Sequence, residues 1–197
     1  MKNNSIDIIA CSVFKYEVDK ISRILDLDVP ISYFDSYLHL FPVKLSETLT
    51  AEIENKISLG KKVLLIYGDC HPFMKEMEQK ENVCKIQGCN CVEILIGREL
   101  RRKLLKEGSF FLMPEWTIRW KEIFKDLLEL PPEHIKSILH EQHKKFVYLD
   151  TGVMPIPYKE IEDCSEFFNL PFEIEKVSLT FLMETIKSGI EDIAERK

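Results

Sequence analysis

The sequence has no long apolar segment and few glycines. Its best apolar run, residues 63–67, is far shorter than the roughly 20 residues that a membrane-spanning helix needs. Met1 is followed by polar residues rather than by an apolar leader, which gives no indication of export. Only 7 glycines and 9 prolines occur among 197 residues, which excludes a collagen-like or low-complexity chain. We therefore expect a folded, cytoplasmic protein without a membrane span.

Basic patches and the common nucleotide-binding and hydrolase motifs are also absent. The 27 Lys and Arg residues are outnumbered by 33 Asp and Glu residues, and they form no cluster that would neutralise a phosphate backbone. The motifs G-x-G-x-x-G, G-x-x-x-x-G-K-[ST] and G-x-S-x-G do not occur. We expect neither nucleic-acid binding nor the chemistry of a conventional dinucleotide enzyme, P-loop NTPase or serine hydrolase.

Apolar runs and helical periodicity alternate along the whole chain. Residues 61–67 end in a continuous apolar run, typical of a strand buried on both faces, whereas residues 45–59 and 71–80 are predicted helices. Strand–helix alternation with short connections predicts an α/β fold: a Rossmann-like, open, mainly parallel sheet with helices on both faces. We expect a single domain over residues 1–197, with a helical, insertion-like segment at about 109–145.

The six cysteines are the most informative feature of the composition. In a reducing compartment they favour packing, catalysis or metal ligation over disulfides. Cys11, Cys70 and Cys91 each follow a predicted strand and precede a predicted helix. Such turns lie at the carboxyl edge of a parallel sheet, so these thiols converge if their strands are neighbours. Helix N-termini favour the thiolate, which binds a soft metal or attacks an electrophile.

A fourth thiol, Cys89, lies two residues before Cys91. We predict that these four cysteines form a metal site or a reactive-thiol site. The alternative is packing, because cysteine is among the most buried residue types. The two other cysteines, Cys84 within a strand and Cys164 on an apolar helix face, are predicted to be core residues.

Four further side chains near strand ends are second-tier candidates: His71, His39, Asp69 and Asp150. The two histidines are predicted to be metal ligands or proton donors at the same sheet edge, with a solvated imidazole as the alternative. The two aspartates also follow strands, and their alternative role is to cap the next helix.

Six short motifs form an ordered set along the chain. They are Ile8-Ile-Ala-Cys11 with Glu17, Leu38-His-Leu-Phe-Pro42, Tyr67-Gly-Asp-Cys70, Cys89-Asn-Cys91 running to Gly97, Phe111-Leu-Met-Pro-Glu-Trp116 and Tyr148-Leu-Asp-Thr-Gly152. This set resembles the domain-of-unknown-function 1638 family. Where the family typically has His-Asp-Cys, this chain has Cys89-Asn90-Cys91. Cysteine therefore replaces histidine at position 89, and both residue types are metal ligands. Glu115 replaces a usual glycine.

The resemblance implies a biological setting. The family is known chiefly from methanogenic archaea and anaerobic bacteria, where its members are often encoded near corrinoid-dependent methyltransferases. A corrinoid protein or a methyltransferase subunit is the partner that this setting implies. The resemblance also supports a functional site at Cys11, Cys70 and Cys91, but it implies no reaction.

Together these observations favour a cysteine-ligated metal-binding accessory protein that binds a corrinoid protein or a methyltransferase in methanogenic or anaerobic methyl-transfer metabolism. The expected cofactor is an iron–sulfur cluster or zinc, with Cys89 or His71 as the fourth ligand. One alternative is a zinc-thiolate-dependent methyltransferase, whose metal keeps an open coordination position. Another is a metal-free protein–protein interaction module. Trp116 and Trp120 are predicted to form either a contact surface or part of the core.

Overall fold

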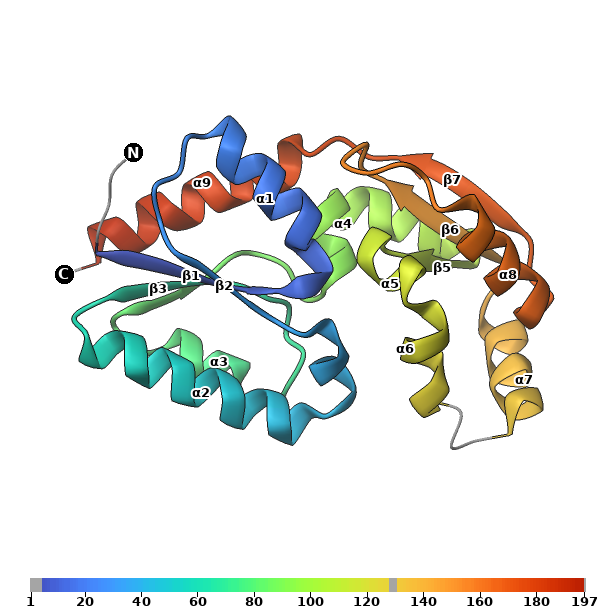
Figure 1. The fold of residues 1–197 in the computed structure, drawn as a ribbon, viewed down its shortest axis with the longest axis horizontal. Coiled ribbons are helices and arrows are strands. Elements are labelled where there is room, and N and C mark those ends of the chain that lie inside the picture. The colour runs from blue at the N-terminus through green and yellow to red at the C-terminus, as the bar shows by residue number, and fades with distance from the viewer. Residues whose placement is uncertain (1–4, 128–130, 197) are drawn as a thin grey trace. The chain divides into compact units, whose positions relative to one another are not determined.

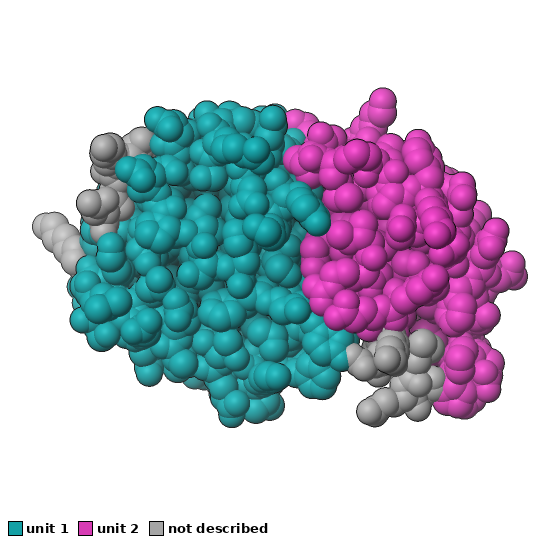
Figure 2. All heavy atoms as spheres, in the orientation of Figure 1, with its two compact units in different colours: residues 1–97, 179–197 teal, residues 98–178 magenta. Residues whose placement is uncertain are grey.

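The computed structural model describes residues 5–127 and 131–196 and shows an α/β protein with two parallel sheets (Figure 1). The chain divides into two compact units, Met1–Gly97 with Leu179–Lys197 and Arg98–Ser178 (Figure 2). The predicted α/β class with parallel strands is therefore confirmed. The sequence predicted one domain and one sheet, whereas the strands form two sheets, one in each unit.

The first unit contains a four-stranded parallel sheet in the order β2-β1-β3-β4. Its strands are β1 (Ile6–Cys11), β2 (Ile31–Phe34), β3 (Lys62–Ile66) and β4 (Val83–Lys85). Every residue of β1 is buried, as expected for a central strand covered on both faces. Its buried Asp7 carboxylate is neutralised by Lys56 and Lys61, whose ammonium nitrogens lie 2.8 and 3.7 Å from its oxygens.

Helices cover both faces of this sheet. They are α1 (Lys15–Ile24), α2 (Pro42–Ser58), α3 (Met74–Glu78) and α9 (Thr180–Glu195), with two short 3-10 helices, η1 (Ser12–Phe14) and η2 (Ser36–Leu40). Helices α1 and α9 lie on one face, and α2 and α3 on the other (Figure 1). Helix α9 approaches the sheet closely at Gly189, where an added Cβ would lie 2.8 Å from a methyl carbon of Leu64.

Helix α4 (Cys91–Lys106) follows β4 and is interrupted at Gly97, which has a φ of 76° and ends the first segment of the first unit. A positive φ is readily adopted only by glycine, so this residue allows the chain to change direction inside a continuous helical sequence. Helix α4 therefore consists of two helical segments joined at Gly97.

The second unit contains a three-stranded parallel sheet in the order β5-β6-β7. Its strands are β5 (Ser109–Leu112), β6 (Lys145–Asp150) and β7 (Phe172–Lys176), and its helices are α5 (Pro114–Ile118), α6 (Trp120–Leu127), α7 (Pro132–Gln142) and α8 (Tyr158–Phe168). The segment 109–145, expected to be a helical, insertion-like segment, begins with β5, and this strand pairs with β6. It is therefore part of the second unit's own fold.

An aromatic cluster forms the core of the second unit. Phe168 is fully buried, and its ring centroid lies 4.8 Å from that of Phe124, 5.8 Å from that of Phe146 and 6.2 Å from that of Trp120. Trp120 is only 6% exposed. Of the two roles predicted for this tryptophan, packing in the core is the one that the structure shows.

Local differences from the sequence-based expectations are small. The helix predicted at 71–80 is reduced to α3, because the residues before Met74 form an irregular loop. Cys84 and Cys164 are buried, which confirms their predicted core positions. Within the described residues, no helix has the length and apolar character that crossing a membrane requires.

Candidate functional site

The three cysteines singled out by the sequence lie on neighbouring strands and turns of the first sheet. Cys11 is the last residue of β1, Cys70 lies in the loop after β3, and Cys91 begins α4 after β4. Strand β3 pairs with β1 on one side and with β4 on the other. The three thiols therefore share one carboxyl edge, where open parallel sheets bind their ligands.

These thiols and one histidine lie close enough to affect one another's pKa values. His39, in η2, affects Cys70; Cys70 and Cys91 affect each other; and Cys11 affects Cys91. The backbone N–H of Gly68 also donates to the Cys91 sulfur. We call His39, Cys70, Cys91 and Cys11 the thiol line.

The loop after β3 and the loop after β4 are held against each other beside the thiol line. The backbone N–H of Asp69 donates to the carbonyl of Cys89, with an N···O distance of 2.9 Å. Gly68 lies so close to Asn90 that an added Cβ would be 2.6 Å from the Asn90 Cα. This contact is between two backbones, so no side chain can move to relieve it. The close approach of the two loops thus depends on glycine at position 68.

Two of the thiols hold their protons strongly. The hydrogen bond to Cys91 and then burial raise the pKa of Cys70, although His39 opposes this rise. The hydrogen bond to Cys11 raises the pKa of Cys91 well above its ordinary value. The prediction that helix N-termini lower these pKa values is therefore wrong for both residues, because contact with further thiols and burial outweigh the helix dipole. A protonated thiol is a poor nucleophile, which disfavours a reactive-thiol site.

His39 is affected in the opposite sense. Its hydrogen bond to Cys70 raises the imidazole pKa, and partial burial only offsets part of this rise. The residue itself is exposed, so the thiol line reaches the protein surface at this end. An imidazole at the open end of a row of thiols is well placed to exchange protons or a metal ion with solvent.

Cys89 takes part in a different set of contacts from the other candidate cysteines. Its thiol is exposed and donates to a carboxylate oxygen of Glu93 at 3.1 Å, and the Asn90 side-chain amide donates to its sulfur at 3.3 Å. The structure thus brings three of the four predicted cysteines together and supplies His39, rather than Cys89, as the fourth donor.

The remaining candidates take part in other contacts. His71 is buried, and its Nδ1 accepts the backbone N–H of Phe73 at 3.2 Å; burial lowers the pKa of its imidazole. Asp69 forms an ion pair with Lys85. Asp150 ends β6 in the second sheet and accepts the N–H of Gly152, so the expectation that it shares the cysteine edge is wrong.

Two residues of the site were missed by sequence reasoning. Tyr67 is buried beside the cysteines, and its hydroxyl donates to the Ala10 carbonyl at 3.4 Å; burial and the nearby Cys11 and Cys91 raise its pKa. Lys85 has a buried side chain at the end of β4. Both residues could have been recognised in the sequence. Tyr67 ends the apolar run at residues 63–67, and Lys85 is a charged residue in a short strand.

The donor types of the thiol line suit a soft metal ion. Within the described part of the chain, no group of three or more His, Cys, Asp or Glu side chains is arranged as a set of metal ligands. Binding of one ion would therefore need side-chain rotations about Cα–Cβ bonds that turn the donor atoms toward a common point.

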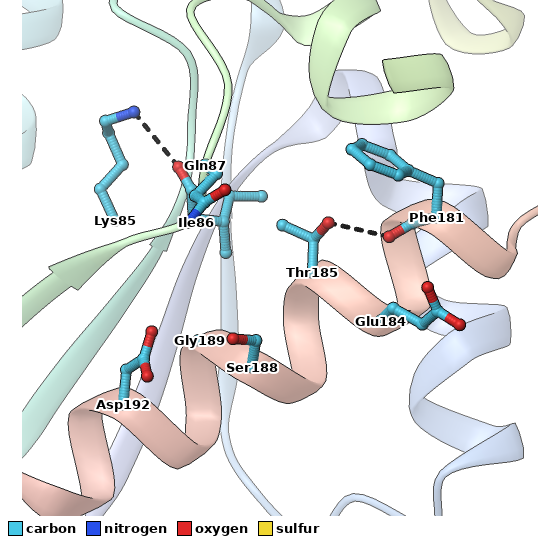
Figure 3. A pocket seen from close by; sticks show the side chains of 9 residues that line it. All are labelled: Lys85, Ile86, Gln87, Phe181, Glu184, Thr185, Ser188, Gly189 and Asp192. Carbon is cyan, nitrogen blue, oxygen red and sulfur yellow. Dashed lines mark hydrogen bonds between the residues drawn. The ribbon is translucent and has the colours of Figure 1, made fainter. Parts of the chain in front are cut away.

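A separate cavity of about 220 Å³ lies between the end of β4 and α9 (Figure 3). Its lining residues are Lys85, Ile86, Gln87, Phe181, Glu184, Thr185, Ser188, Gly189 and Asp192. The Thr185 hydroxyl donates to the carbonyl of Phe181 on its own helix, as the dashed line in Figure 3 shows. The lining contains no thiol or imidazole, so the chemistry of the thiol line is not continued there.

We expect the substitution Gly68→Ala to open the paired loops. A Cβ at this position clashes with the Asn90 backbone, so the native stability should fall by about 1–3 kcal/mol. The rate of Cys91 alkylation, followed by mass spectrometry, should rise about tenfold for each 1.4 kcal/mol by which the contact between the loops is weakened. The control Gly60→Ala strains a positive φ but meets no atom within 4 Å, and it should leave Cys91 labelling unchanged. Equal labelling rates in both variants would contradict the proposed role of Gly68.

The fold and the thiol line define an α/β protein with a cysteine- and histidine-lined edge on a parallel sheet. A family model described as "Protein of unknown function (DUF1638)" matches residues 33–186. The chain belongs to this family, which confirms the resemblance seen in the sequence motifs. No curated protein matches the chain. No solved structure matches it either.

Proposed function

We propose that this protein binds a single zinc ion through the three thiols and the imidazole of the thiol line. The observation that carries the proposal is that Cys11, Cys70, Cys91 and His39, from four separate segments, lie close enough together to affect one another's pKa values. Three cysteines and one histidine are a usual ligand set for zinc in proteins. Cys89 is not required for this set.

The types of donor favour zinc over an iron–sulfur cluster. Three cysteines with one histidine are a usual ligand set for structural zinc, whereas iron–sulfur clusters are most often held by four cysteine thiolates.

The complete donor set supports an accessory role. Four protein ligands leave no open position on a tetrahedral zinc ion, whereas catalytic zinc keeps one for water or substrate. We therefore propose a metal-binding accessory protein, and the family resemblance suggests a corrinoid protein or a methyltransferase of anaerobic methyl-transfer metabolism as its partner. The exposure of His39 favours one alternative, a zinc-thiolate methyltransferase in which a thiol substrate displaces this ligand.

The first experiment is elemental analysis of protein purified without oxygen. Zinc at one equivalent per chain, without iron or acid-labile sulfide, is the expected result. Iron and sulfide together would replace the zinc proposal with a cluster. Protein that contains neither metal and takes up no zinc on titration would leave the metal-free interaction module as the function.

Zinc affinity is expected to rise steeply with pH. The raised pKa values of Cys70 and Cys91 keep both thiols protonated near neutral pH, and each must lose its proton to bind zinc. Release of these two protons alone corresponds to a rise in the association constant of about 100-fold per pH unit below these pKa values, so the slope should be at least this steep. Competition with a chromophoric chelator between pH 6 and 8 measures this slope. An affinity that does not change with pH would contradict zinc ligation by these two thiols.

A further inference from the structure

Lys85 is a charged residue in an unusual position for its type. It is the last residue of β4, and its side chain is only 7% exposed. Lysine is seldom buried to this degree unless its charge and its donors are satisfied. The groups that its three N–H donors bind therefore indicate the role of the ammonium.

The lysine ammonium has three oxygen partners. Its Nζ lies 3.2 Å from the carbonyl oxygen of Ile86, 3.1 Å from that of Gly88 and 3.3 Å from a carboxylate oxygen of Asp69. Figure 3 shows the side chain turned toward the Ile86 carbonyl. Three donors thus meet three acceptors, and one of the acceptors carries the opposite charge.

These partners come from the two loops that carry thiols. Asp69 immediately precedes Cys70 in the loop after β3, and Gly88 lies in the loop that leads to Cys91. The ammonium is one link between the loops, and the backbone hydrogen bond between Asp69 and Cys89 is a second. The separation of the Cys70 and Cys91 sulfur atoms depends on how these loops are held.

We infer that Lys85 is a positioning residue, which uses its ammonium to hold the Cys70 loop against the Cys91 loop and so keeps the two thiols at the spacing that metal binding requires. The metal-binding part of this inference rests on the proposed function. The loop contacts themselves are independent of any metal, so the effect of Lys85 on the two thiols can be measured with and without zinc.

The test variant is Lys85→Met, which keeps a long apolar side chain and removes the three donors. Zinc affinity should fall about 10- to 100-fold, the usual effect of losing a group that orients metal ligands. The cobalt(II) form should also lose sulfur-to-cobalt charge-transfer intensity, which a general loss of stability would not change in folded protein. Lys80→Met is the control, because Lys80 is 38% exposed and pairs only at the surface with Glu54; its zinc affinity and spectrum should not change.

A second measurement removes zinc from the experiment. Metal-free protein is equilibrated with oxidised and reduced dithiothreitol, so that two protein thiols give two electrons and two protons to the cyclic disulfide and become a protein disulfide. Peptide mapping then measures the Cys70–Cys91 disulfide and gives the effective concentration of one thiol at the other. We expect Lys85→Met to lower this value about tenfold relative to both the unaltered protein and Lys80→Met, equivalent to about 1.4 kcal/mol.

The two measurements separate the inference from the proposed function. Unaltered protein that binds no zinc, but loses Cys70–Cys91 pairing on Lys85→Met, would refute the zinc site and support the positioning role. Equal pairing and equal zinc affinity in the variant and the control would overturn the positioning role, as would unaltered protein in which Cys70 and Cys91 do not pair. If Lys85→Met does not fold, Asp69→Asn removes the ionic contact alone and should shift both measurements in the same direction by a smaller amount.

Discussion

The Cys91→Ser variant should lose stoichiometric zinc, with an affinity at least about 100-fold below that of the unaltered protein. Cys91 is the centre of the thiol line, because its pKa is affected by Cys11, Cys70 and the backbone N–H of Gly68. Serine keeps the size and polarity of the side chain but is a poor ligand for zinc compared with a thiolate. Losing a ligand should cost more than the 10- to 100-fold typical of losing an outer-shell contact.

The matched control for this substitution is Cys89→Ser, two residues earlier in the same segment. Its thiol contacts Glu93 and Asn90 rather than the thiol line, so zinc stoichiometry and affinity should not change. Isothermal titration of metal-free protein, with circular dichroism to verify folding, distinguishes the two variants. If Cys89→Ser lost zinc and Cys91→Ser kept it, the ligand set proposed from the structure would be wrong.

The largest effect on stability is expected from Phe168→Ala. Phe168 is fully buried in the aromatic cluster of the second unit, so its truncation leaves a cavity and should lower the free energy of unfolding by about 3–5 kcal/mol. Both tryptophans of the chain, Trp116 and Trp120, belong to this unit. Their fluorescence during urea denaturation therefore reports its unfolding specifically.

Tyr158→Ala provides a control on the same helix, α8. This side chain is 52% exposed, and its removal should change the free energy of unfolding by no more than about 0.5 kcal/mol. Since Phe168 and the thiol line belong to different units, Phe168→Ala should also retain zinc affinity under conditions where the protein is folded. A loss below about 1 kcal/mol for Phe168→Ala would show that the aromatic cluster is less tightly packed than the ring distances indicate.

Much of the fold could be predicted from the sequence because its elements are regular. The all-apolar end of β3 and the periodicity of α2 identify one buried strand and one amphipathic helix without further information. The division into two sheets could not be predicted, because hydrophobic periodicity identifies strands but does not specify which of them pair. The shortening of α3 accompanies a local hydrogen bond that hydrophobic periodicity does not reveal, from the backbone N–H of Phe73 to the His71 side chain.

The candidate site was predictable to the extent that it follows from strand ends. Cys11, Cys70 and Cys91 were identified because βα turns of parallel strands share an edge, and the pairing of β3 with both β1 and β4 fulfils that condition. His39 was also a candidate at this edge, but its place in the ligand set ahead of Cys89 could not be foreseen, because side-chain direction within a loop depends on backbone angles that composition does not determine. The close approach at Gly68 was likewise visible only in three dimensions.

The first unit is assembled from two separate stretches of sequence, and the second stretch supplies α9. Residues 98–178 can therefore complete their own sheet on the ribosome while the sheet that bears the thiols still lacks α9 as cover for one face. Gly189 makes that final contact a close one, so docking of α9 should be a late and cooperative step of folding. Until α9 has been synthesised, a nascent chain thus carries its cysteines on a sheet that lacks this cover, and we expect those thiols to be more accessible to oxidation during that interval.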